Sequence, residues 1–124
     1  MPSSTLRHGS SSKGSRLAAL WAGLAAGPLA WAALLQTNYV LSYVACEQRH
    51  TWMLHLATAV ALALVALGAL AAWRARPADD EIASATAEAR ARFMATGGLA
   101  LCAGFALVIL ATELPVLILR PCTP

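Results

Sequence analysis

The chain has 124 residues, of which 59% are hydrophobic and only 12% are charged, and its mean hydropathy is +0.62. These values exclude an ordinary soluble domain and predict a single, all-α, membrane-embedded unit. The formal net charge is +3, but the basic residues lie at the ends of apolar runs and form no patch interleaved with aromatic side chains. We therefore expect no nucleic-acid partner.

Residues 1–16, MPSSTLRHGSSSKGSR, precede the first apolar run and consist largely of Ser, Gly and basic residues. A segment with so little to bury is expected to form a disordered, solvated tail. The alternative is that Arg7, Lys13 and Arg16 bind polyphosphate or lipid headgroups.

Three apolar runs are long enough to cross a bilayer as helices. The clearest, residues 52–73, contains no acidic residue, Lys or Arg. At a rise of roughly 1.5 Å per residue it makes a helix of about 33 Å, the thickness of a hydrocarbon core. The other two are expected over about residues 17–45 and 93–119. For the first run a cleaved signal peptide is the alternative, although the apolar sequence continues past the A-x-A-like site at residues 30–32. The prediction is one domain of three transmembrane helices over residues 17–124.

Residues 77–92, PADDEIASATAEARAR, connect the second and third runs. They open with three carboxylates and close with two arginines, an arrangement that a helix dipole favours. Glu88 and Arg92 also form a favourable i, i+4 pair. We therefore expect a short surface helix here. The carboxylates of residues 79–81 are expected to cap it, since adjacent side chains on a helix point in different directions and make a poor cation site.

Lys and Arg are unequally divided between the two ends of the spans. Two of the nine, Arg49 and Arg120, lie at one end, and the others lie in the tail and around the 77–92 connection. Because cytoplasmic segments carry the excess of positive charge, the tail and the connection are expected in the cytoplasm. The turn over residues 46–51 and the C-terminus then face the periplasm, with the protein in a bacterial inner membrane.

Two of the spans carry a face of small residues, which lets neighbouring helix backbones approach closely. These residues are Ala19, Gly23 and Gly27 in the first span and Gly97, Ala100, Gly104 and Ala111 in the third. We expect both faces to pack against other helices. Pro28 should kink the first span, because it removes one backbone donor.

Aromatic residues lie near the ends of the spans, at Tyr39, Tyr43, Trp52 and Trp73. Their rings suit the headgroup level, with the apolar body facing inward and the polar group facing water. We expect these four residues to lie at the membrane interfaces. A redox or proton-relay role for the two tyrosines is the alternative.

Two of the three cysteines border the same end of the bundle. Cys46 follows the first span and Cys122 follows the third, both on the outer side, where disulfides form and persist. We predict a disulfide between them, with two separate thiols as the alternative, because a sequence does not give the Cα separation. Cys102 lies within the third span and is expected to be a small buried residue. The chain has no C-x-x-C pair, so thiol redox chemistry is not expected.

Two ionisable side chains, His55 and Glu113, lie within the spans. Burying such groups is costly, so they are the first candidates for a functional site. Both fall in the outer half, where Gln36 and Asn38 of the first span could join them in a polar cluster that links three helices. The alternative is structural, with His55 and Glu113 satisfying one another. A haem ligated by His55 is not expected, because a second axial ligand at that depth is missing. No metal or other cofactor is expected either.

Three segments carry a resemblance to known proteins: GPLAW at residues 27–31, NYVLSYVAC at 38–46 and ARFMATGGLALCAGFALVILATELPVLILRPC at 91–122. With the His55-containing second span, they resemble a group of small, largely uncharacterised three-span proteins of proteobacteria. The genes of that group often lie near those of haem-copper terminal oxidases and their assembly factors. The resemblance covers most of the chain after the tail and implies an accessory subunit or assembly helper of a respiratory oxidase. It also implies the pairing of the two outer cysteines, and it assigns no role to the two ionisable residues.

These observations favour a non-catalytic protein that packs against a larger membrane complex. No enzymatic activity and no small-molecule substrate are expected, because the connections are too short to enclose one. The alternative is a small proton- or cation-conducting, or pore-forming, oligomer centred on Glu113. The expected partners are the lipid bilayer and other membrane-protein subunits of the terminal-oxidase type.

Overall fold

The computed structural model describes residues 3–76, 85–119 and 122, and within the helices its side chains are described from Lys13 and from Thr86 onward. It contains three α-helices: α1 (Ser3–Gln48), α2 (Trp52–Arg74) and α3 (Ala85–Leu119). Each is long and apolar enough to cross a membrane. The prediction of an all-α protein with three transmembrane spans is confirmed.

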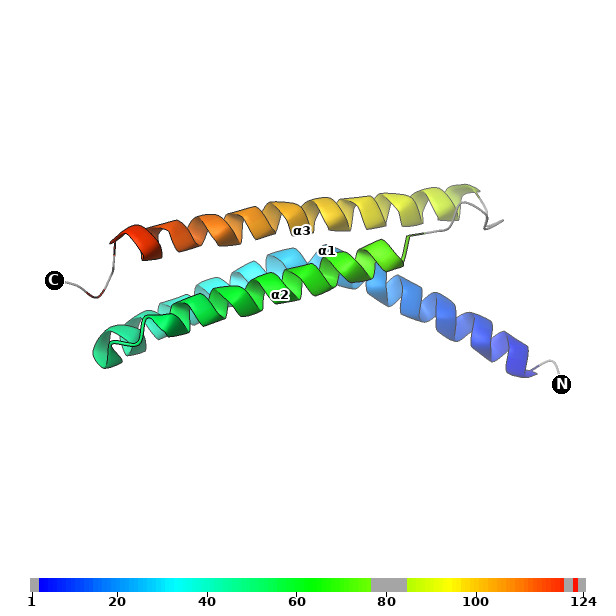
Figure 1. Cartoon of the computed structure of the whole chain (residues 1–124). Coiled ribbons are helices and arrows are strands. Elements are labelled where there is room, and N and C mark those ends of the chain that lie inside the picture. The colour runs from blue at the N-terminus through cyan, green and yellow to red at the C-terminus, as the bar shows by residue number, and fades with distance from the viewer. Residues whose placement is uncertain (1–2, 77–84, 120–121, 123–124) are drawn as a thin grey trace.

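The three helices run alternately up and down and pack against one another in all three pairs. Figure 1 shows α3 alongside α2, with α1 passing behind α2. The start of α1, the end of α2 and the start of α3 lie at one end of the molecule. We call this the arginine end, because Arg16, Arg74 and Arg76 lie there. The α1–α2 turn and the end of α3 lie at the other, here called the disulfide end (Figure 1).

The expected disordered tail differs from the structure, in which α1 begins at Ser3 and continues unbroken into the span. Helix formation is costly to nucleate and cheap to extend. Once the apolar segment is helical, each preceding residue adds one more hydrogen bond to an existing helix, an effect that composition alone does not capture.

The short separate helix expected between the second and third spans is not present in the described part of the chain. Residues 85–92 are instead the first turns of α3, which is continuous to Leu119. The sequence from 85 to 96 contains neither Gly nor Pro, so nothing interrupts the helix before the membrane. The expected i, i+4 pair is present, with Arg92 donating to Glu88 at 2.9 Å. The acidic residues 79–81 lie outside the described residues.

The buried positions of the helices are spaced mostly three and four residues apart. In α1 they include Leu20, Gly23, Gly27, Ala30 and Leu34; in α2 they are Leu54, Thr58, Ala61, Val65, Gly68 and Ala72; in α3 they include Ala95, Gly98, Cys102 and Ile109. This spacing is typical of helices that pack side by side at a shallow angle, as in a left-handed bundle. The buried stripe is narrow and rich in small residues, so the helix backbones lie close together.

The remaining surface of the helices is strongly apolar. Its large exposed side chains include Leu56, Val60, Leu64 and Leu67 on α2 and Leu107, Leu110, Leu114 and Leu117 on α3. A soluble monomer rarely exposes apolar patches on this scale. Together with the three spans, this surface makes the chain an integral membrane protein in contact with lipid.

A bend and a tight turn shape the path of α1. Figure 1 shows α1 changing direction near the middle of its length, where Pro28 lies within the helix. Proline removes the hydrogen bond to the carbonyl group four residues earlier and bends the helix. At its far end, His50 N donates to Ala45 O at 3.1 Å and Arg49 adopts a left-handed conformation, with φ 57°. This pattern is the Schellman motif, which ends the helix and turns the chain back into α2.

Candidate functional site

A disulfide joins Cys46, near the end of α1, to Cys122, three residues beyond the end of α3. The two Cα atoms are 5.1 Å apart, within the range that a disulfide requires. The predicted pairing is confirmed, and it links the first and last helices covalently at one end of the bundle.

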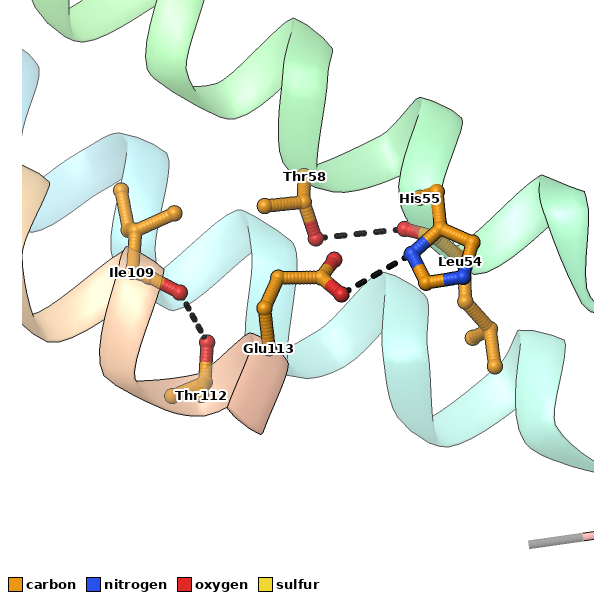
Figure 2. Close-up of polar contacts among 6 residues, drawn as sticks. All are labelled: Leu54, His55, Thr58, Ile109, Thr112 and Glu113. Carbon is orange, nitrogen blue, oxygen red and sulfur yellow. Dashed lines mark hydrogen bonds and ion pairs between the residues drawn. The ribbon is translucent and has the colours of Figure 1, made fainter. Parts of the chain in front are cut away.

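A side-chain hydrogen bond between α2 and α3 lies in the same half of the molecule. His55 Nδ1 is 3.0 Å from Glu113 Oε2. Figure 2 shows the Glu113 side chain extending from α3 toward α2, where His55 and Thr58 lie. The Thr58 hydroxyl group does not donate to Glu113, because it donates to Leu54 O of its own helix at 3.2 Å. The two ionisable residues of the spans are thus direct neighbours.

The two members of this pair differ in exposure. The Glu113 side chain is 12% exposed, whereas the His55 side chain is 45% exposed. Glu113 Oε1 is buried and accepts no hydrogen bond from any described residue. Among the described residues, the carboxyl group is therefore hydrogen-bonded to His55 alone, and the imidazole is partly exposed at the surface of the bundle.

Neither Gln36 nor Asn38 hydrogen-bonds to this pair in the described part of the chain. Gln36 is exposed on α1. The side-chain oxygen of Asn38 and Trp31 Nε1 are both buried, and neither has a hydrogen-bond partner among the residues that the structure describes. The structure thus brings together two of the four residues of the expected polar cluster.

Glycines create the closest helix contacts, and they lie toward the arginine end. A Cβ atom added at Gly23 would lie 2.6 Å from the Cβ of Ala72, and one added at Gly98 would lie 3.1 Å from the carbonyl carbon of Gly23. A Cβ at Gly68 would overlap the Cβ of Ala26. These glycines come from all three helices, so the three backbones converge at one level of the bundle.

Cys102 lies at this convergence and is only 2% exposed. Its thiol donates to the carbonyl oxygen of Gly23 at 3.3 Å. Its environment matches the expectation of a small buried residue, with a weak interhelical hydrogen bond in addition.

Of the two expected small-residue faces, the one on α1 packs against the other helices, whereas the one on α3 is largely exposed. Ala19 packs against a buried cluster of Leu20, Ala75 and Ala95, and a Cβ at Gly27 would lie 3.0 Å from the ring of Phe105. In α3, by contrast, Ala100 and Ala111 are exposed. A Cβ at Gly97 would make an ordinary contact, and one at Gly104 would meet no described atom within 4 Å.

Gly68 and Gly98 were missing from the expected packing residues. Gly68 is the only glycine of α2, and an isolated glycine inside an apolar helix is itself an indication of close packing, because it lowers helix propensity. Gly98 adjoins Gly97, so two neighbouring faces of α3 carry small residues, and spacing alone does not distinguish them.

The four expected interface aromatics, Tyr39, Tyr43, Trp52 and Trp73, are all exposed. Tyr39 and Tyr43 pack edge to face, with ring centroids 5.6 Å apart. The guanidinium group of Arg76 lies over the Trp73 ring, 4.3 Å from its centroid. The tyrosines and Trp52 are nearer the disulfide end, and Trp73 is at the arginine end.

The described residues contain no group of three or more His, Cys, Asp or Glu side chains that could hold a metal ion. They do form an apolar groove of about 350 Å³ between α1 and α2, bordered by Thr37, Trp52 and Met53. Compared with family models, curated proteins and solved structures, the chain matches none of them. The arrangement is suited to holding helices together and to contact with lipid or other helices.

Proposed function

We propose that this protein is a non-catalytic membrane subunit that packs through α3 against a larger complex. The observation that carries the proposal is the open space at Gly104, where an added Cβ would meet no described atom within 4 Å. Gly104 lies in a groove of about 330 Å³ with Ala100, Leu101, Phe105 and Val108. In lipid, helices associate through close packing at small residues, so this surface suits a helix of another subunit.

The proposed complex is a respiratory oxidase, and the protein is its accessory subunit or assembly helper. This step rests on the resemblance of the GPLAW, NYVLSYVAC and third-span sequences to small proteins encoded near haem-copper oxidases. The proposed location is a bacterial inner membrane, with the arginine end in the cytoplasm and the disulfide end in the periplasm. The unequal distribution of basic residues supports this orientation, and so does a disulfide, which persists in an oxidising compartment.

Affinity purification of the full chain from its native membranes in mild detergent tests this proposal. The expected result is co-purification of a complex with the absorption spectrum of haem-copper oxidase. Gly104→Leu should abolish the association, because the added side chain fills the groove. The matched control is Ala63→Leu, which adds bulk at an exposed position of α2 outside the described grooves. Recovery of a lone small protein, or equal loss in both variants, would contradict the proposal.

A second candidate function is favoured by the His55 and Glu113 contact of 3.0 Å. With Glu113 Oε1 buried and unpartnered among the described residues, the carboxyl group has a free oxygen that can take up a proton or a cation in an oligomer. Proton and cation flux into vesicles containing the purified protein tests this function. Flux that is lost in Glu113→Gln would support a conducting oligomer, and no flux in the unaltered protein would exclude it.

A further inference from the structure

A hollow of about 580 Å³ opens between α1 and α2 at the arginine end. Its lining includes Ser15, Arg16 and Ala19 of α1 and Arg74, Ala75 and Arg76 from the end of α2. Three arginines from segments about sixty residues apart in sequence thus line one space. Such convergence places positive charge where the apolar part of the two helices ends.

Two of the three arginines of this hollow have a defined contact with α2 or the residues that follow it. Arg16 Nε donates to Ala75 O at 3.2 Å, which fixes its side chain against the end of α2. Arg76 lies over the Trp73 ring, and Arg74 is exposed. Neither Arg74 nor Arg76 forms an ion pair with a carboxylate of the described residues. Within the described part of the chain, the positive charges of Arg74 and Arg76 are therefore available to bind an anion.

The depth of the hollow in the membrane is indicated by aromatic side chains. Trp21 of α1 and Trp73 of α2 are both exposed on the outer surface of the bundle, and tryptophan concentrates at the level of lipid headgroups. Arg74 and Arg76 come directly after Trp73 in the sequence. Because tryptophan favours the headgroup level, we expect the arginines that follow Trp73 to lie at the level of lipid phosphates.

We propose that this hollow binds the phosphate group of an anionic phospholipid. Guanidinium groups pair with phosphate oxygens through two parallel hydrogen bonds. Basic pockets between transmembrane helices on the positively charged side bind anionic headgroups. The apolar surface beside the hollow accommodates the acyl chains, which a free phosphate ion lacks. This site is distinct from the α3 surface of the proposed function and does not depend on it.

Native mass spectrometry of the full-length protein, titrated with phosphatidylglycerol or phosphatidylcholine of the same acyl chains, tests the proposal. The unaltered protein should prefer phosphatidylglycerol by about fivefold for each arginine engaged. Arg74→Gln/Arg76→Gln should lower the preference to near unity. The control Arg49→Gln/Arg90→Gln removes the same charge at exposed positions outside the hollow and should retain the preference. Circular dichroism of each variant verifies that it is folded.

Four results would overturn the proposal. Equal binding of the two lipids by the unaltered protein would show that the hollow does not select an anionic headgroup. Equal loss of preference in the control would show only long-range attraction. Complete displacement of phosphatidylglycerol by millimolar inorganic phosphate would identify a site for a soluble anion. A preference that appeared only after Asp79, Asp80 and Glu81 were changed to amides would likewise count against it.

Discussion

The two halves of this bundle are held together by different means. Toward the arginine end, Gly23, Gly68 and Gly98 let the backbones of all three helices meet, and Cys102 is buried between them. Toward the disulfide end, the helices are joined by side chains, through the Cys46 to Cys122 disulfide and the contact of His55 with Glu113. The groove between α1 and α2 lies in this second half.

The difference shows how a short membrane protein can be stable without a large core. Lipid tails are as apolar as leucine, so burying apolar side chains between helices gains little, and association depends on close packing and polar contacts. Where glycine permits backbone contact, packing suffices. Toward the disulfide end, a disulfide and a side-chain hydrogen bond add to the packing.

The largest expected effect comes from removing the disulfide. In Cys46→Ser, the free energy of unfolding should fall by no more than about 4 kcal/mol, the chain-entropy value for so long a loop. That value is an upper limit, because helices already inserted in a membrane have less freedom than an unfolded chain. Unfolding in mixed micelles measures the change.

Thiol labelling sharpens this prediction. In the unaltered protein, a maleimide should label no cysteine before reduction, since Cys102 is 2% exposed and Cys46 is bonded to Cys122. After mild reduction, two thiols should react. Labelling of Cys46 or Cys122 without reductant would contradict the structure of the disulfide end.

The second effect concerns the glycine contacts. In Gly68→Ala the new Cβ would overlap Ala26, so the free energy of unfolding should fall by about 1–3 kcal/mol, as overpacking of a filled interior does. Gly104→Ala makes the same chemical change in open space and should have no effect or raise stability through helix propensity. Both are measured by thermal unfolding in detergent. Equal effects of the two substitutions would show that the backbones do not converge at Gly68.

A smaller effect is expected for the hydrogen bond between His55 and Glu113. A double-mutant cycle of His55→Leu and Glu113→Leu should give a coupling free energy of about 0.6 kcal/mol and at most about 1.7 kcal/mol, the mean and the maximum for interhelical polar contacts in a membrane protein. The control cycle uses Thr112→Ala in place of the Glu113 variant, because Thr112 donates to Ile109 O of its own helix at 2.6 Å. A coupling free energy of zero in the first cycle, or an equal one in both cycles, would show that the contact of His55 with Glu113 does not stabilise the disulfide end.

The features that sequence analysis recovered depend on the order and length of the apolar runs along the chain. The bounds of the second span, expected over 52–73 and found as Trp52–Arg74, follow from a continuous apolar run ended by arginines. The disulfide followed from counting crossings, which places Cys46 and Cys122 on one side of the membrane. For the cysteines the sequence still left two separate thiols as an alternative, and the Cα separation of 5.1 Å decides for the disulfide.

The features it did not recover depend on how helices are rotated against one another. Gly97 and Gly98 belong to neighbouring faces of α3, and both faces contain small residues, so the sequence is compatible with either. The three-dimensional packing shows which face is used: Gly98 lies against the backbone of Gly23, whereas no described atom lies within 4 Å of a Cβ added at Gly104. Rotation also explains why Gln36 is exposed instead of joining His55 and Glu113.

The smallest expected change is a gain in stability at the α1–α2 turn. Arg49 occupies a left-handed backbone conformation, with φ 57°, which costs a residue with a Cβ atom about 1 kcal/mol and costs glycine nothing. Arg49→Gly should therefore raise the free energy of unfolding by up to that amount. Gln48→Gly is the matched control, since Gln48 is helical and glycine there should lower stability by a similar amount. Opposite signs at adjacent positions would locate the end of α1 at residue 48, and a loss of stability in both variants would contradict the turn that brings Cys46 to the disulfide.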